Sequence, residues 1–243
     1  MPDTDGLTVL AVHGIGEVVP GADLSRVIAA ALAPEAPQGP RLLDGDVLVV
    51  TQKVVSKAEG RLVELDHADP GAKAALVERE SVRVLRRRGE LIVSETRHGF
   101  VCANAGIDLS NVAEGTAALL PEDSDLSARR LRASLGHALG VDVGVVVSDT
   151  FGRTWRRGVT DVAIGCAGVA AIVDLKGTRD AGGRELVATE VCVADEIAGA
   201  AELVMGKDRG IPVAIVRGVP AAWMRPASVR AEIVRPPNED LFR

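Results

Sequence analysis

Oxygen-bearing side chains follow an apolar run near the middle of the chain. The run, Val143 to Val147, is short and rich in β-branched residues, as is typical of a buried strand, and Ser148, Asp149 and Thr150 come next. A carboxylate beside a hydroxyl at the end of a buried strand could hold a hard cation, because such cations prefer oxygen ligands. A strand end followed by an ordinary turn is an equally good interpretation of these residues.

Basic residues come directly after this corner: Arg153, Arg156 and Arg157. Arg is the side chain best suited to bidentate contact with a phosphate or a carboxylate. An oxygen-rich corner followed by an arginine cluster therefore indicates a metal–phosphate site. A solvated basic face is the alternative that needs no ligand.

Oxygen and amide groups are also concentrated in the segment from Cys102 to Thr116, which shows no helical or strand periodicity over most of its length. These groups belong to Asn104, Asp108, Ser110, Asn111 and Glu114. Such a loop forms Asx-turns, or it holds a metal ion and its ligand. Two oxygen-rich corners, at Asp108 and Asp149, together strengthen the case for a cation site.

Polar and basic side chains follow another predicted strand, at residues 47–50: Gln52, Lys53, Ser56 and Lys57. Their charges and hydroxyl could bind phosphate oxygens, but chemistry alone slightly favours an exposed strand end with solvated lysines. The chain has no Walker-type motif, and the Gly-x-Gly pair at positions 14 and 16 lacks the third glycine of a dinucleotide fingerprint. A P-loop and a Rossmann fingerprint are therefore excluded, and a plain turn is favoured at the two glycines.

The composition is that of a folded, acidic protein, with 243 residues, a formal net charge of −6 and 47% apolar residues. This length suffices for one large domain or two small ones. The negative charge argues against non-specific nucleic-acid binding, and three Phe, two Trp and no Tyr are too few for a base-stacking platform.

Three cysteines without metal-ligand spacing fit a reducing compartment. No apolar run approaches the ~20 residues of a membrane span, and the acidic N-terminus lacks the basic region of a signal peptide. We therefore expect a cytoplasmic protein with no nucleic-acid and no membrane partner.

Hydrophobic periodicity predicts a mixture of strands and helices. Strands are expected at residues 7–12, 47–50, 91–96, 100–103, 143–147, 186–191 and 212–216. Helices are expected after Asp23, from Asp69-Pro70 to about Arg88, from Ser124 or Asp125 to Gly140, and through Met205. The Pro- and Arg-rich segment from Pro220 to Arg243 is expected to fray.

Five segments, in the same order along the chain, resemble coenzyme F420:L-glutamate ligases, also called F420 γ-glutamyl ligases. The segments are GIGEV (14–18), DGDVLVVTQKVVSKAEGR (44–61), CANAGIDLSNVAEGT (102–116), VSDTFGRTWRRGVTDVAIGCAGV (147–169) and CVADEIAGAAELVMGKDRGIPVAIVRG (192–218). They cover most of the chain and together are specific. Composition and spacing by themselves indicate only a cation–phosphate site.

The resemblance implies a GTP-dependent ligase of coenzyme F420 biosynthesis. In this reaction GTP phosphorylates the terminal carboxylate of the F420 precursor (F420-0), and the amine of L-glutamate attacks the acyl phosphate to form an amide. Later glutamates are added through γ-linkages. Two divalent cations, Mg²⁺ or Mn²⁺, would bridge the phosphates, and K⁺ is a further expected ion. The alternatives are another phosphate-activating amide ligase on the same scaffold and an inactive dimer that binds nucleotide and metal.

The resemblance also implies the fold and the assembly. We expect a mixed α/β (α+β) fold of two lobes, a catalytic unit that fills residues 1–243, and an intertwined homodimer. Some actinobacterial members carry an extra C-terminal, flavin-binding, nitroreductase-like domain, which we expect to be absent here.

Matching positions imply the roles of individual residues. Asp108 and Asp149 would bind one metal ion and Thr150 the second, Asn111 would contact the nucleotide, and Asp149 and Lys57 would be the catalytic residues. The GTP site would be lined by Ile15, Gly16, Glu17, Val18, Gln52, Lys53, Lys57, Met205, Gly206, Lys207, Asp208, Arg209, Gly210 and Ile211, with Lys57 nearest the phosphates.

Lys207 departs from the family pattern, because some members have an acidic metal ligand directly after the Met-Gly pair. Either Asp208 replaces that ligand through a shifted loop, or the second metal ion is held differently.

Overall fold

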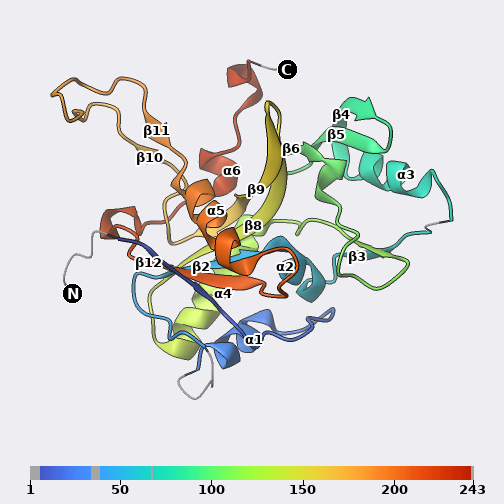
Figure 1. Cartoon of the computed structure of the whole chain (residues 1–243), viewed down its shortest axis with the longest axis horizontal. Coiled ribbons are helices and arrows are strands. Elements are labelled where there is room, and N and C mark those ends of the chain that lie inside the picture. Colours follow the sequence, from blue (N-terminus) through green and yellow to red (C-terminus); the bar gives the residue numbers. More distant parts are fainter. Residues whose placement is uncertain (1–5, 34–38, 67, 242–243) are drawn as a thin grey trace.

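A five-stranded sheet forms the centre of the protein, for which a computed structural model describes residues 6–33, 39–66 and 68–241. The strands lie in the order β1 (Thr8–Ala11), β12 (Val213–Arg217), β2 (Val47–Thr51), β8 (Gly144–Arg153) and β9 (Arg156–Ala167). The β2–β8 pair is parallel, and the other pairs of this sheet are antiparallel. Together with the helices around it, this sheet gives the expected mixed α+β fold (Figure 1).

Helices cover both faces of the central sheet. One face is covered by α1 (Leu24–Ala31), α2 (Gln52–Ala58) and α4 (Ser124–Leu139), and the other by α5 (Val193–Met205). A strand that is buried on both faces needs apolar residues at every position, so β2 and the first half of β8 are continuous apolar runs rather than alternating ones.

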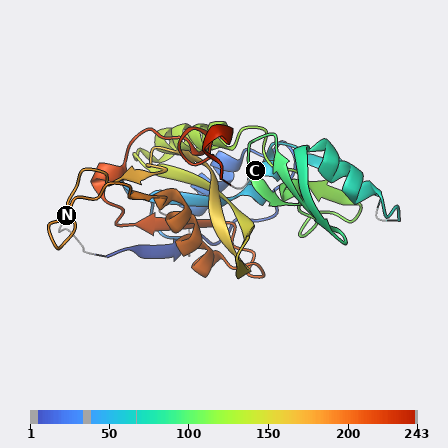
Figure 2. The same cartoon turned by 90° about the horizontal axis from the view of Figure 1, so that it is seen from above.

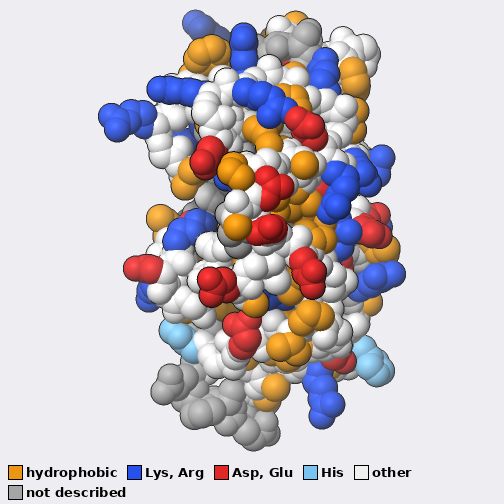
Figure 3. All heavy atoms as spheres, turned by 90° about the vertical axis from the view of Figure 1, so that its right-hand side faces the viewer, with side chains coloured by type: hydrophobic (Ala, Val, Ile, Leu, Met, Phe, Trp, Pro, Cys, Tyr) orange, Lys and Arg blue, Asp and Glu red, His pale blue; other side chains and the backbone are white. Residues whose placement is uncertain are grey.

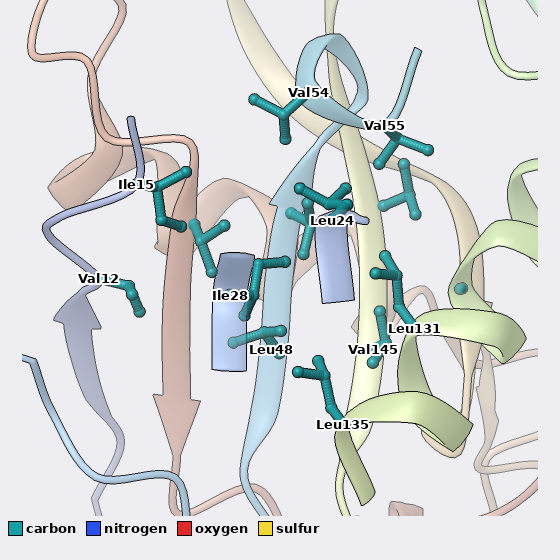
Figure 4. Close-up of a cluster of buried hydrophobic side chains, with 14 of the residues drawn as sticks. Val12, Ile15, Leu24, Ile28, Leu48, Val54, Val55, Leu131, Leu135 and Val145 are labelled. Atoms are coloured by element: carbon teal, nitrogen blue, oxygen red, sulfur yellow. The ribbon is translucent and has the colours of Figure 1, made fainter. Parts of the chain in front are cut away.

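Alternate side chains of β2 belong to different cores. Leu48 and Val50 pack with the layer of α1, α2 and α4, whereas Val47 and Val49 pack with the layer of α5. Figure 4 shows the first core, where side chains from the sheet meet Ile28 of α1 and Leu135 of α4. These two layers hold β2 and β8 rigidly side by side, with their carboxyl ends at the same edge.

A second lobe, formed by residues 61–119, lies to one side of the central sheet (Figures 1 and 2). Its elements are β3 (Leu62–Glu64), α3 (Ala72–Arg79), β4 (Ser81–Arg88), β5 (Leu91–Thr96), β6 (Val101–Ala103), η1 (Asn104–Gly106) and β7 (Thr116–Ala118). It has small cores of its own, one around Leu76 and Leu119 and another around Val77 and Ile92. The lobe contacts the sheet where the ring of Phe100 meets that of Phe151, edge to face at 6.0 Å.

The predicted helix from Asp69-Pro70 to Arg88 is wrong beyond Arg79. Residues Ser81–Arg88 form β4, which pairs with β5 and presents most of its arginines to solvent. Asp69 does not cap the helix; its carboxylate accepts a hydrogen bond from the backbone of Gly71 in a turn at 2.7 Å. On the side of this lobe, basic and acidic side chains are interspersed (Figure 3), and Arg83 pairs with Glu95 across the strands at 3.2 Å. Cross-strand pairing of this kind is not visible in local sequence.

The expectation that the C-terminal segment frays is wrong for residues 220–234, which pack against the core on the α5 side of the sheet, whereas residues 235–241 are mostly exposed. This segment contains η2 (Ala221–Trp223), α6 (Val229–Glu232) and η3 (Pro237–Glu239). Val229 is fully buried, and Asp125 of α4 accepts hydrogen bonds from its backbone and from the hydroxyl of Ser228. A buried carboxylate far away in sequence thus anchors a segment whose composition resembles that of a loose tail.

Most other predicted elements are confirmed, with small shifts at their ends, whereas β8 runs on to Arg153, beyond the predicted end at Val147. Asp23 caps α1 as expected, whereas α4 is capped by Asp123, one residue before the predicted cap, and ends at Gly140. The strand predicted at 186–191 is reduced to β11 (Glu190–Val191), which pairs with β10 (Val173–Asp174). Among the described residues, no helix is both long enough and apolar enough to cross a membrane.

Candidate active site

The first corner lies on β8, which does not end where the sequence predicts. After a register shift at Val147/Ser148, β8 continues to Arg153 and forms a long hairpin with β9. Asp149 and Thr150 are therefore strand residues. The arginines lie near the exposed end of this hairpin, where Arg153 donates a hydrogen bond to the backbone carbonyl of Arg157 at 3.1 Å.

Asp149 has few partners among the residues that the structure describes. The one hydrogen bond to its carboxylate comes from the backbone of Thr150 at 2.8 Å, and no Lys or Arg of the described residues lies within ion-pair distance. The pKa of Asp149 is raised to about 7, mainly by burial and also by the negative charges of Asp161 and Asp108, whereas the hydrogen bond from Thr150 and the charge of Lys207 oppose the shift. Its local environment therefore favours an added cation.

The second corner lies in the loop of the second lobe, after η1. Asp108 accepts hydrogen bonds from the backbone and the hydroxyl of Ser110 at 2.7 Å, and its other oxygen pairs with Lys53 Nζ at 2.8 Å. These hydrogen bonds lower the pKa of Asp108 although burial opposes its ionisation. Asn111 adopts a left-handed backbone conformation in this loop, with φ of 53°.

The two corners lie within electrostatic range of each other at the junction of the lobes. The charge of Asp108 acts on Asp149, and the charge of Asp149 in turn helps to raise the pKa of the Cys102 thiol on β6, which burial raises to about 12. Asp108 and Asp149, some forty positions apart in the sequence, thus come within electrostatic range of each other, and β6 contacts β8 at the same junction.

Helix α2 carries the lysines to this centre, so the interpretation of residues 52–57 as an exposed strand end is wrong. Lys57 is only 6% exposed and pairs with Glu17 of the glycine-containing turn. Gln52 is buried and donates to Ser56 Oγ at 2.7 Å and to the Leu119 carbonyl at 3.0 Å. Because β2 passes directly into α2, Lys53 and Lys57 are held at the carboxyl end of the sheet rather than solvated.

Asp161 is a site residue that the sequence did not single out. It lies opposite Thr150 on β9, is only 2% exposed, and accepts hydrogen bonds from Thr150 Oγ1 at 2.6 Å and Ser148 Oγ at 3.0 Å. An acidic residue inside an otherwise apolar strand was the available signal, because such a carboxylate must find partners in the fold.

The loop after α5 carries residues that were predicted to line the GTP site, and one of them, Lys207, reaches Asp161. Lys207 Nζ lies 3.4 Å from Asp161 Oδ1 and 3.9 Å from Glu202 Oε1, whereas Asp208 is exposed. Arg209 turns back and donates to the Val204 carbonyl at 3.0 Å. Met205 and Ile211 are buried anchors of the loop.

The turn at residues 14–18 is also anchored by buried apolar side chains. The side chains of Ile15 and Val18 pack in the core, whereas Gly16 and Glu17 are exposed.

The donor set of this centre fits a hard divalent cation. Within the described ranges no three His, Cys, Asp or Glu side chains form a metal-binding group, so the set consists of the carboxylates of Asp108 and Asp149. The next strand residue, Thr150, faces the other side of β8, where its hydroxyl donates to Asp161. Oxygen ligands of this kind, with remaining positions left for water or phosphate, are typical of Mg²⁺ sites. The unpaired carboxylate of Asp149 is the observation that favours a cation here.

The structure defines a class of α+β proteins that have two lobes. Acidic residues lie at the junction of the lobes, and lysines flank them. A family model described as F420-0:Gamma-glutamyl ligase matches residues 14–218. The chain therefore belongs to the F420-0:γ-glutamyl ligase family.

Curated relatives match this chain over nearly its full length. The coenzyme F420:L-glutamate ligase of Methanothermobacter thermautotrophicus is 44% identical over 253 aligned positions, which cover 98% of this chain and 99% of the relative. The protein of the same name from Methanopyrus kandleri is 44% identical and covers 93% of this chain and 94% of its own length. That from Methanocaldococcus jannaschii is 38% identical, with 82% and 85% covered.

Proposed function

We propose that this protein is a GTP-dependent ligase that joins L-glutamate to the coenzyme F420 precursor F420-0 and then adds further glutamates through γ-linkages. The observation that carries the proposal is that Asp108, paired with Lys53 of α2, acts electrostatically on the buried Asp149 at the lobe junction, in a chain of this family. The names of the relatives support the choice of substrates.

The proposed reaction has two steps. The terminal carboxylate of F420-0 attacks the γ-phosphorus of GTP, the bond to the bridging oxygen breaks, and GDP leaves. The neutral amine of L-glutamate then attacks the carbonyl carbon of the acyl phosphate, phosphate leaves with the bonding electrons, and the nitrogen loses a proton. An amide bond forms at the expense of a phosphoanhydride.

Positioning and charge would supply most of the catalysis, as in other phosphoryl transfers. Asp108 and Asp149 would hold Mg²⁺ or Mn²⁺ on one face of β8, Thr150 lies at the second cation position on the other face, and K⁺ is a further proposed ion. When bound, such cations offset the negative charge of the phosphates. Lys53 and Lys57 would bind phosphate oxygens. Asn111, the turn at 15–18 and the loop at 205–211 would enclose the nucleotide.

A homodimer is part of the proposal. Large apolar side chains are exposed on three separate elements of the chain: Trp155 at the hairpin end (84% exposed), Val187 before β11 (79%) and Leu203 on α5 (82%). A dimer interface that includes these side chains would remove from water apolar surface that the single chain leaves exposed.

One assay tests the function. The purified protein is incubated with F420-0, L-glutamate, GTP and Mn²⁺, and the products are analysed by mass spectrometry. We expect masses that increase by one glutamate residue at a time and that require GTP. Products without this mass increase would reject the proposal. GTP-dependent ligation of another acid and amine would favour a different amide ligase on the same scaffold. GTP binding without turnover would favour an inactive dimer that binds nucleotide and metal.

A further inference from the structure

A lysine and a buried carboxylate form an ion pair on the far side of β8 from Asp149. Asp161 is enclosed by the hydroxyls of Ser148 and Thr150, and the Lys207 ammonium group lies 3.4 Å away. A buried carboxylate without a counter-charge is strongly unfavourable. Lys207 therefore supplies a positive charge beside the buried carboxylate of Asp161, next to Thr150.

The carboxylates of the centre differ in whether a basic side chain forms an ion pair with them. Asp108 pairs with Lys53 and Asp161 with Lys207, whereas Asp149 has no Lys or Arg partner within 4 Å among the residues described. The deficit of positive charge is therefore on the side of Asp108 and Asp149. On the side of Thr150 and Asp161, the ammonium group of Lys207 already supplies a positive charge.

The position of Lys207 also disfavours a divalent cation at Thr150. Thr150 Oγ1 donates its hydrogen to Asp161 Oδ1, the same oxygen that Lys207 approaches. A divalent ion on that hydroxyl would lie close to the ammonium group, and the two positive charges would repel one another. Lys207 is 59% exposed, so its ammonium group is accessible to an anionic ligand in the same place.

We propose that the Lys207 ammonium group takes the place of a second divalent metal ion in this chain, so that one divalent ion, at Asp108 and Asp149, binds with each GTP. This inference rests on the proposed GTP-dependent function. Lys207 would contact the triphosphate from the side of Thr150 and Asp161. At the position after the Met-Gly pair, the ammonium group of Lys207 would thus replace the second metal ion, and a shifted Asp208 would not be needed.

Metal counting tests the inference without turnover. The full chain is dialysed to equilibrium against Mn²⁺ and a non-hydrolysable GTP analogue, and retained Mn²⁺ and nucleotide are measured per chain. We expect one Mn²⁺ per nucleotide for the unaltered protein and two for Lys207→Glu, which puts a carboxylate beside Asp161. Lys176→Glu makes the same charge change on an exposed residue between β10 and β11 and is expected to retain one.

The outcomes separate the two proposals. Two Mn²⁺ per nucleotide in the unaltered protein would overturn the inference alone, and so would a single Mn²⁺ in a folded Lys207→Glu protein. Failure of the unaltered protein to retain the nucleotide would overturn the proposed function, and the inference with it. If circular dichroism shows that Lys207→Glu does not fold, Lys207→Gln replaces it, and a second Mn²⁺ is then expected at higher free Mn²⁺.

Discussion

Asp149 and Asp161 lie on paired strands of one hairpin, yet their surroundings give them different roles. Asp161 is enclosed by two hydroxyls and a lysine, which are the partners of a structural carboxylate. Asp149 is raised in pKa to about 7 by burial and by neighbouring acids. Perturbed carboxylates of this kind are concentrated at functional sites, because a bound cation or substrate is needed to relieve them.

Removing the charge of Asp149 tests its role. Asp149→Asn keeps the shape of the side chain, so we expect the fold to be retained while ligation falls by at least ~100-fold, the size typical of a lost transition-state charge contact. Glutamate addition is measured by mass spectrometry. Glu90→Gln, in the exposed turn between β4 and β5, is the matched control. Unchanged ligation by Asp149→Asn would show that Asp149 holds no catalytic cation.

At the scale of elements, the centre depends on how segments are joined. The direct passage of β2 into α2 puts Lys57 inside the protein, and the continuation of β8 into the hairpin puts Asp149 and Thr150 on a rigid strand. Asp125 near the start of α4 has a comparable structural role, because it receives hydrogen bonds from Cys166 N on β9 and Val229 N on α6 at 2.9 Å.

Asp125→Ala should detach the C-terminal segment. The change leaves several buried donors without an acceptor, and we expect the free energy of unfolding to fall by about 3 kcal/mol, as for the loss of hydrogen bonds to a charged group. Urea unfolding measures the difference, with the exposed Glu90→Ala as control. A loss below about 1 kcal/mol would mean that α6 is held by its apolar contacts alone.

His98, in the turn between β5 and β6, makes stability depend on pH. Its pKa is lowered by burial, its Nδ1 is buried without a partner, and its Nε2 lies 2.8 Å from the Pro121 carbonyl. The imidazolium is thus disfavoured in the folded state. Stability should be complete above the unfolded pKa of about 6.5 and should fall as the pH drops from there through the lower folded pKa.

The melting temperature between pH 8 and pH 5 is the measurement for His98. His98→Gln should reduce the part of the acid-induced fall that lies below about pH 6.5. His137→Gln, at the exposed end of α4, should leave that fall unchanged. Identical pH profiles for the unaltered protein and His98→Gln would refute this assignment.

The whole molecule brings its chemistry to the junction between the central sheet and the second lobe (Figures 1 and 2). Asp108 and Asn111 come from the lobe, and Asp149, Thr150 and the lysines of α2 from the sheet. Neither part alone contains the set, so relative movement of the two would open or close the centre. The exposed apolar side chains lie at the end of the β8–β9 hairpin, before β11 and on α5, where the proposed dimer would cover them.

Light scattering after gel filtration tests the dimer. We expect a mass twice that of the 25.3 kDa chain. Leu203→Glu puts a charge on the most exposed apolar position of α5 and should increase the fraction of monomer at micromolar concentration. Glu196→Gln on the same helix is the control and should leave the mass unchanged. A monomer in the unaltered protein would refute the proposed dimer.

The sequence by itself determined the elements that depend on neighbouring residues. Buried strands appear as β-branched apolar runs, and α1 and α4 begin and end at residues whose side chains or backbone freedom suit caps. The motifs also sufficed to assign the family. These features are local, because a cap or an apolar run acts within a few positions of itself.

Only the tertiary structure decided which distant residues share an environment. Pairing with β5 makes residues 81–88 a strand although their charges resemble a helix end, and Asp125 orders a tail whose composition resembles disorder. The partnership of Asp161 with Lys207 likewise depends on β9 and the loop after α5 meeting in space. Strand pairing and charge compensation act across long stretches of chain, so the local pattern of residues does not contain them.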